Sequence, residues 1–326
     1  MIYVLLTDAI SLAAVLLYGC VGETITEKAG HLNLGIPGIM CMGTAGGCLF
    51  LSWYLNGLTD FAFASLFVMI LLSLIGAFLV ASLTGGIYAL LTVTLRCNQN
   101  ITGLAMTTFG TGLCQHIMDT YVMSNDTIKN NFLSAGKLIS KGFVSKQTYS
   151  LISVFFSHGF FVYFGIIVAV VAALVLKKTR VGLHLRAVGE NPATADAAGI
   201  NVTLYKYVAI LIGSGIAGIG GVFNVMERSL GSWDNTLTIE GYGWLAIALV
   251  IFTLWKPDVS ILGSFIFGAL TIVPHVLSTV KPTQMELLKL LPYVVTVIVL
   301  IFTSIRKNRD SQAPAALGLA YFREDR

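Results

Sequence analysis

Charge is the property that this sequence has least of. Only 11% of its 326 residues are Asp, Glu, Lys or Arg, against roughly a quarter in an ordinary soluble domain. Between Lys28 and Arg96 the one charged residue is Asp60, and five later runs have no charge at all: 147–176, 207–226, 241–255, 259–280 and 290–305. A charge at mid-bilayer costs about 2.5–3.5 kcal/mol. The scarcity therefore excludes a soluble domain and predicts a polytopic membrane protein.

Motifs for catalysis are also missing. The chain has no G-x-x-x-x-G-K-[ST] phosphate loop, since Leu138 follows its one Gly-Lys pair, Gly136-Lys137. It has no H-E-x-x-H and no C-x-x-C, and its five histidines are scattered without ligand spacing. A net charge of +4 gives no reason to expect nucleic acid as a partner. We expect no enzyme activity, metal or cofactor in this chain.

What the sequence does have is long apolar blocks, and they predict an all-α membrane protein with eight to ten transmembrane helices in one domain over 1–326. The blocks are approximately 2–19, 36–55, 61–95, 101–122, 151–176, 204–226, 241–255, 259–280 and 286–305. As a straight helix, block 61–95 would be roughly 52 Å long against a core of about 30 Å. It is either one tilted helix or two pieces broken near Gly85-Gly86. Residues 22–34 contain Glu23, Glu27 and Lys28, and we interpret them as a connection that cannot span.

Two basic segments predict the orientation. Residues 177–186 (KKTRVGLHLR) contain no acid, and the tail over 305–326 begins IRKNRD. Basic residues near helix ends favour the cytoplasmic side, so both segments are expected there, with four spans between them. Residues 123–150 must then lie outside, against the trend of their own lysines. The first block lacks the basic start of a signal peptide and is expected to stay as a helix.

A dinucleotide-type pattern occurs in an unsuitable place. Gly213-Ser214-Gly215-Ile216-Ala217-Gly218 fits G-x-G-x-x-G, but that motif requires a preceding strand. Here it lies inside an uncharged run. Gly213, Ala217 and Gly221 share one helix face, where small residues let a neighbouring helix approach closely. We predict helix packing and not nucleotide binding.

One short polar segment, at about 190–200, has the pattern of a complete helix. Asn191 suits the N-cap, Pro192 the first helical position and Gly199 the C-terminal stop. So short a helix is unstable alone in water and needs a surface to pack against. It is either a docking element for a partner or a plain capped linker.

At this segment the sequence resembles the inner-membrane permeases of bacterial ABC importers for nucleosides and simple sugars. LHLRAVGENPATADAAGI (183–200) is similar to the coupling segment of that family, and GETITEKAGHLNLGIPGIMCMG (22–43) to its G-E-x-x-x-E-x-x-G-x-L-N-L-G segment. LRCNQNITGLAMTTFGTGL (95–113) resembles a third block. APAALGLAYFRE (313–324) resembles the carboxy end of the second permease of nucleoside systems.

The resemblance implies one permease of an importer in the bacterial inner membrane, with a cytoplasmic C-terminus. The implied partners are a cytoplasmic ATP-binding subunit that holds ATP and Mg, a second, non-identical permease and an extracytoplasmic solute-binding lipoprotein. The residues that couple to the ATPase would be Glu190, Asn191, Pro192, Ala193, Asp196, Ala197, Ala198 and Gly199. Closure of the ATPase would move this short helix and switch access to the path.

Polar and aromatic residues within the blocks are candidates for the solute path, since intramembrane polarity often marks function. We choose Asn33, Asn98, Gln99, Thr107, Thr108, Phe109, Asn224 and Trp244. The absence of a charge clearly at mid-span favours a neutral solute. The expected solute is a purine-type nucleoside, and the alternatives are a simple sugar of the ribose or galactose type, or riboflavin. An ion-coupled secondary transporter would need charges at mid-span.

Overall fold

The apolar blocks form helices in the computed structural model, which describes residues 2–58, 61–124, 126–144, 151–276, 284, 287–306 and 312–322. The first half contains α1 (Ile2–Lys28), α2 (Ile36–Asn56), η1 (Phe61–Phe63), α3 (Leu66–Ala89), η2 (Leu90–Thr94), α4 (Gln99–Ile117), η3 (Met118–Val122) and α5 (Asp126–Ile139). The second half contains α6 (Leu151–Phe156), α7 (Phe160–Lys178), α8 (Arg180–Glu190), α9 (Pro192–Ala197), α10 (Val202–Phe223), η4 (Asn224–Arg228), α11 (Leu237–Phe252), α12 (Pro257–Val276) and α14 (Leu291–Arg306). No strand occurs in the described residues, so the all-α prediction is confirmed.

Six helices of the described chain are long and apolar enough to cross a membrane. They are Tyr3–Lys28, Ile36–Asn56, Leu66–Thr94, Phe160–Lys178, Val202–Arg228 and Pro257–Pro274. Helices α11 and α14 are apolar but shorter. The chain is therefore a polytopic helical protein, while the predicted count of eight to ten spans is not reached by these criteria.

The long third block is one helix and is not broken at Gly85-Gly86. It runs without interruption over Leu66–Thr94, with its last turn in π-helical geometry. A Cβ atom at Gly85 would lie 2.1 Å from Ser214 Oγ of α10. Gly85 therefore serves close helix packing, which is a common role of glycine between membrane helices.

The core of the bundle lies where α1, α2 and α10 meet along small residues. A Cβ at Gly213 of α10 would lie 2.4 Å from the carbonyl oxygen of Gly22, and one at Gly221 would lie 2.1 Å from that of Met40. Ala217 is fully buried in the same contact. Small side chains on this face of α10 thus let three backbones approach one another.

The prediction for residues 22–34 was wrong in part, because α1 continues through both glutamates to Lys28. The acids are tolerated because each is buried with a donor. Glu23 Oε1 accepts the Asn33 backbone N–H at 2.9 Å, and Glu27 Oε2 accepts the indole N–H of Trp255. A buried carboxylate without such a partner would be costly.

The true connection is the non-helical segment 29–35, which descends into the bundle. Gly19 of α1 lies against Met40 of α2. From that level α1 continues for nine residues to Lys28, whereas α2 extends back for only four residues to Ile36. At 1.5 Å per residue, the start of α2 therefore lies roughly 7 Å deeper in the bundle than the end of α1. Irregular backbone at such depth is tolerated where protein surrounds it.

The predicted block 151–176 is divided into α6 and α7 at residues 157–159. The carboxylate of Glu227 in η4 accepts the backbone N–H groups of Gly159 at 2.7 Å and of Phe161 at 3.2 Å. A buried anion at the start of α7 satisfies donors that have no partner within the helix. This contact fixes where the helix begins.

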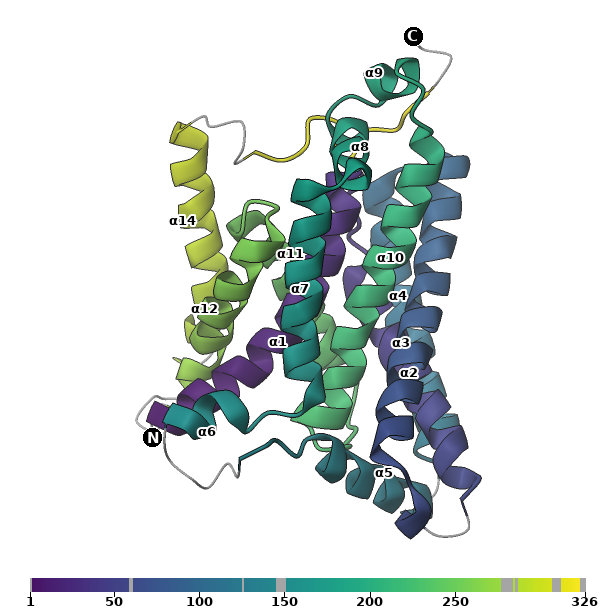
Figure 1. Ribbon diagram of the computed structural model, residues 1–326, viewed down its shortest axis with the longest axis vertical. Helices are drawn as coiled ribbons and strands as arrows, with labels where there is room; N and C mark the ends of the chain where they lie inside the picture. The colour runs from purple at the N-terminus through teal and green to yellow at the C-terminus, as the bar shows by residue number, and fades with distance from the viewer. Residues whose placement is uncertain are drawn as a thin grey trace.

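Different elements lie at the two ends of the bundle. Helices α8 and α9 lie at one end with the carboxy tail, whereas the N-terminus, α5 and α6 lie at the other (Figure 1). We name the first the α9 end. Residues 126–139 of α5 thus lie at the end opposite α9, which is the arrangement expected if block 151–176 crosses once between them and the basic segment 177–186.

Candidate functional site

Helix α9 has the caps that its sequence suggests. Asn191 Oδ1 accepts the backbone N–H of Thr194 at 3.0 Å, and Pro192 occupies the first turn. Gly199 closes the helix with a φ of +81°, in the left-handed region that glycine adopts without strain. The N–H groups of Gly199 and Ile200 bond back to the carbonyls of Asp196 and Ala195 at 2.9 and 3.0 Å. The capped helix predicted at about 190–200 is therefore present as a closed unit, Pro192–Ala197, six residues long.

The two faces of α9 differ in exposure. Ala195 is buried in an apolar cluster with Val188 and Val202, so α9 rests on α8 and on the start of α10. Pro192 and Asp196 are half-buried. The other predicted coupling residues are exposed at the tip of the bundle: Glu190, Asn191, Ala193, Ala197, Ala198 and Gly199. The exposed surface is made mainly of small side chains, which a complementary partner can approach closely.

The carboxy tail fixes α9 from the side. Tyr321 OH donates to Asp196 Oδ2 of α9 at 2.8 Å. The N–H of Ala316 donates to the carbonyl of Gly189, at the end of α8, at 3.0 Å. We name residues 312–322 the strap, because they hold α8 and α9 in place.

The strap also contacts helices that enter the bundle. The N–H of Gly318 donates to the carbonyl of Gly30 at 3.3 Å, and Gln99 Nε2 of α4 donates to the carbonyl of Leu319 at 3.4 Å. Gln99 Oε1 in turn accepts the N–H of Leu32 at 2.9 Å. A movement of α9 can therefore reach α4 and the α1–α2 connection through a continuous set of hydrogen bonds.

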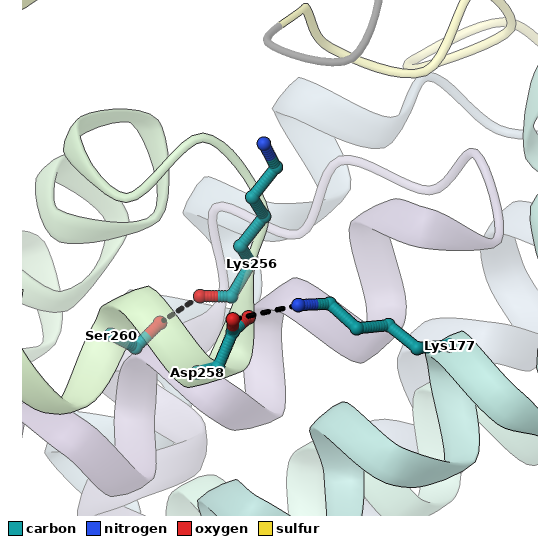
Figure 2. Close-up of polar contacts among 4 residues, drawn as sticks. All are labelled: Lys177, Lys256, Asp258 and Ser260. Carbon is teal, nitrogen blue, oxygen red and sulfur yellow. Dashed lines mark hydrogen bonds and ion pairs between the residues drawn. The ribbon is translucent and has the colours of Figure 1, made fainter.

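An ion pair near the same end joins α7 to α12. Lys177 Nζ lies 2.7 Å from Asp258 Oδ2, and Ser260 Oγ donates to the carbonyl of Lys256 at 3.1 Å (Figure 2). The side chain of Lys256 points away from Asp258 (Figure 2). Both members of the ion pair are about half exposed, so its contribution to stability is small.

Helix α4 has one face that the described residues of this chain leave uncovered. Its inner face packs on α2 and on the preceding segment: Thr107 Oγ1 donates to the carbonyl of Leu34 at 2.9 Å, and Gly110 lies against Gly38. Its outer face, which we name the α4 face, consists of Ile101, Leu104, Ala105, Thr108, Phe109, Gly112 and His116, all exposed. These positions follow one side of a helix. This face is mainly apolar and includes two polar side chains, those of Thr108 and His116.

The predicted path residues fall into separate groups. Thr108 and Phe109 lie on the α4 face, where Phe109 is 51% exposed. Asn98 is exposed at the start of α4, where it caps the helix by accepting the N–H groups of Asn100 and Ile101 at 3.0 and 3.1 Å. The structure thus brings these three to one helix.

The other candidates face the protein interior. Asn33, Gln99 and Thr107 are buried and make hydrogen bonds within the chain. Asn224 is buried in η4 and accepts a bond from Arg228, and Trp244 is half-buried against the main core. Their contacts serve packing in this conformation.

Two features of the α9 end could not be predicted from the sequence: the contact of the strap with α9, and a pair of buried basic side chains. Tyr321 lies in the tail, where only the resemblance drew attention to it, and its bond to Asp196 joins residues that are far apart in the chain. His31 and Lys206 are both buried close to α9. Lys206 lies near the start of α10, where a lysine is commonly expected to be exposed, so the sequence gives no sign that this one is buried.

Comparison with known proteins gives the same class of molecule. The model of the family described as branched-chain amino acid transport system, permease component, matches residues 5–300. A Haloferax volcanii protein, named provisionally as a glucose ABC transporter permease, is 30% identical, covering 98% of each chain. A nucleoside ABC transporter permease of Lactococcus lactis is 29% identical over 87% of each chain. A guanosine ABC transporter permease of Bacillus subtilis is 28% identical over 96% of this chain and 95% of the relative.

The match covers nearly the whole chain, in agreement with the apolar helical bundle and with the segments quoted from the sequence. The description of the family is that of a transport subunit, the permease component. This chain belongs to the family of permease components of the branched-chain amino acid transport system type, and it is the permease subunit of an ABC transporter.

Proposed function

We propose that the chain forms half of the translocation path of an ATP-driven importer for purine-type nucleosides. The observation that carries the proposal is the capped helix α9, exposed at the tip of the bundle and tied through the strap to α4. A second, non-identical permease supplies the other half of the path. ATP and Mg bind to the partner ATPase and not to this chain.

Helix α9 is the surface on which the ATP-binding subunit presses. Ala193, Ala197 and Ala198 are exposed with no long side chain to prevent close contact. Force on α9 passes to Asp196, from there to Tyr321 and the strap, and from Leu319 to Gln99 at the start of α4. Rigid-body movement of packed helices is a general way of switching access.

The α4 face forms the wall of the path, toward the partner permease. Phe109 offers a ring on which a nucleobase can stack, and Thr108 offers a hydroxyl. No Asp, Glu, Lys or Arg lies within α4, which suits a neutral solute. Asn33, Gln99, Asn224 and Trp244 would reach the solute only after a change of conformation.

The α9 end faces the cytoplasm of a bacterial cell, with the C-terminus on the same side. Lys28, Lys177, Lys178, Arg180 and Arg186 lie at or near this end, and basic residues at helix ends favour the cytoplasmic side. The solute-binding lipoprotein then docks at the opposite end, which includes α5. This orientation is part of the proposal.

Uptake by proteoliposomes tests the proposal. The chain is reconstituted with the second permease, the ATP-binding subunit and the solute-binding protein, and labelled guanosine, ribose, glucose and riboflavin are offered with and without internal ATP. We expect guanosine uptake that requires ATP. Uptake driven by an ion gradient without ATP would contradict the proposal.

A simple sugar is the second candidate solute. It is favoured by the Haloferax volcanii relative, which is 30% identical over almost the full length of both chains and is named for glucose. ATP-dependent uptake of glucose or ribose, with none of guanosine, would replace the nucleoside by a sugar and leave the role of α9 intact.

A further inference from the structure

A polar cavity lies beneath α9 at the end of the bundle. Its volume is about 460 Å³. Its walls are formed by His31 of the α1–α2 connection, by the end of η2, by α9, by the start of α10 and by Tyr321 of the strap. The proposed function gives this cavity no role, because no residue of the α4 face is among its lining residues. Its lining is polar, in contrast to the apolar grooves along the sides of α7 and α12.

Lys206 in the wall of this cavity is an unpaired buried cation. It is only 3% exposed, yet its side chain makes no hydrogen bond or ion pair within the described part of the chain. Long cationic side chains are almost never buried without a partner. A buried ammonium beside a cavity therefore indicates that an anion occupies the cavity at some stage.

The surroundings of Lys206 supply further donors. The cavity includes the first turn of α10, which carries the positive end of the helix dipole. Asn201 Oδ1 caps the N–H of Leu204 at 3.0 Å, so the leading N–H groups without a partner in the helix are those of Val202 and Thr203. Arg96 lines the same wall, and its guanidinium lies over the Phe322 ring of the strap, 4.8 Å from the ring centroid. Backbone N–H groups at a helix start together with Lys and Arg are a common set of ligands for phosphate oxygens.

His31 is a second buried group without a partner. It is 1% exposed, and neither ring nitrogen has a hydrogen bond in the described residues. Burial, together with the nearby positive charge of Lys206, lowers the pKa of His31 to about 3. The ring is therefore neutral near pH 7 and adds no second positive charge beside Lys206; because both ring nitrogens are fully buried, His31 supports the wall and is not itself a donor to the ligand.

We propose that this cavity binds a small phosphate monoester whose other end carries hydroxyl groups, such as a sugar phosphate. Lys206, Arg96 and the start of α10 hold the phosphate. The carboxylate of Asp196, which already accepts the hydroxyl of Tyr321 at 2.8 Å, faces the same cavity and can accept a ligand hydroxyl. A carboxylate would repel a bare anion, so its presence favours a ligand with hydroxyl donors besides the phosphate.

The size of the cavity supports the same class of ligand. A volume of about 460 Å³ lies within the usual range of small-molecule sites, roughly 300–1,000 Å³, and exceeds what inorganic phosphate alone would fill. Because α9 and the strap form part of the wall, a bound ligand contacts both. The binding itself does not depend on the proposed transport function.

Calorimetric titration of the purified full chain tests the inference. The protein is held in a maltoside detergent free of phosphate and titrated with ribose 5-phosphate, inorganic phosphate and ribose. We expect ribose 5-phosphate to bind more tightly than inorganic phosphate, and ribose not to bind. In nanodiscs of phosphatidylcholine with phosphatidylglycerol, ribose 5-phosphate should still bind, because a lipid phosphodiester is not the ligand.

Two variants remove the site by different means. Lys206→Met deletes the cation and should weaken ribose 5-phosphate binding by at least about tenfold, the effect of losing a charged hydrogen bond. Without ligand it should melt at a higher temperature than the wild type, because an unpaired buried charge is gone. Thr203→Glu places a carboxylate at an exposed position in the first turn of α10, where an acid is favourable for the helix, and should abolish binding.

Lys178→Met is the matched control, since Lys178 is an exposed lysine near the same end and outside the cavity wall. It should bind ribose 5-phosphate as the wild type does. Equal binding by the wild type and by Lys206→Met would overturn the inference, as would binding of ribose without phosphate. Loss of ribose 5-phosphate binding in phosphatidylglycerol nanodiscs would assign the cavity to a lipid headgroup and would also overturn it.

Discussion

Helix α9 and the α4 face are both exposed surfaces of one chain, but they are built differently. Helix α9 is a six-residue unit, capped at both ends and held by the strap, and it exposes small side chains. The α4 face runs along a 19-residue helix and exposes a ring, a hydroxyl and aliphatic groups together. Helix α9 is thus suited to transmit movement, and the α4 face to contact a solute. We therefore expect mutations in α9 to affect ATP-driven transport and mutations on the α4 face to affect solute binding.

The largest effect is expected from Ala197→Arg in α9. A long cation on the surface that we assign to the ATP-binding subunit would be buried without a partner, at a cost of several kcal/mol. Since 1.4 kcal/mol is tenfold, ATP-driven uptake should fall by about a hundredfold or more. Uptake into proteoliposomes measures this, with chain insertion checked by detergent-extracted yield.

Gln312→Arg is the control for that variant, because Gln312 is an exposed residue at the start of the strap and takes no part in the hydrogen bonds of the strap to α8, α9 and α4 described above. It should transport normally. Uptake at the wild-type rate by Ala197→Arg would show that α9 is not the surface through which the ATP-binding subunit drives transport.

Phe109→Ala should affect recognition and leave drive unchanged. Loss of a stacked ring costs about 1–3 kcal/mol per base, so the KM for guanosine uptake should rise by about tenfold while ATP hydrolysis continues. Phe67→Ala is the matched control, since Phe67 is an exposed aromatic residue of α3, 72% accessible and outside the α4 face. Equal KM values for Phe109→Ala and Phe67→Ala would exclude Phe109 from the path.

Tyr321→Phe weakens the contact of the strap with α9, and so tests whether the strap connects α9 to the α4 face. It removes the 2.8 Å hydrogen bond to Asp196, worth about 0.5–1.5 kcal/mol. The ratio of guanosine transported to ATP hydrolysed should fall by about threefold, with the KM unchanged. Tyr163→Phe, which removes a bond to the carbonyl of Phe155, should keep the wild-type ratio. An unchanged ratio in both variants would show that the strap carries no force.

The smallest effect concerns stability near α9. The pKa of His31 is about 3 because of burial and nearby Lys206, against about 6.5 in an unfolded chain. The unfolded chain therefore takes up a proton first as pH falls, so the free energy of unfolding contributed by neutral His31 is complete above pH 6.5 and is lost progressively toward pH 3. Melting temperatures in detergent at pH 7.5 and 5.5 should differ less in His31→Gln than in the wild type. His116→Gln, an exposed histidine, should keep the wild-type difference.

Local signals made α9 predictable. Asn191, Pro192 and Gly199 act within a few residues of one another, so their sequence spacing contains the geometry of the caps. The uncharged runs likewise predicted the apolar helices, because the cost of a buried charge is a property of each run on its own.

Contacts between distant residues could not be predicted. Glu27 looked like a reason to end α1, but its acceptance of the Trp255 indole N–H lets the helix continue. Glu227 likewise divides block 151–176 by bonding to Gly159. Which side of α4 stays uncovered depends on how α2 packs on Gly110, so Thr107 and Thr108 could not be told apart by sequence.

Site-directed cross-linking tests the central claim most directly. In a Cys97→Ser background, which removes the exposed cysteine among the described residues, cysteine is introduced at position 197 or 108 and the assembled transporter is treated with a short bifunctional reagent. We predict a product between Ala197→Cys and the ATP-binding subunit, and none between Thr108→Cys and that subunit. Absence of the product at 197, or its equal formation from 108, would contradict the assignment of α9 as the surface on which the ATPase acts.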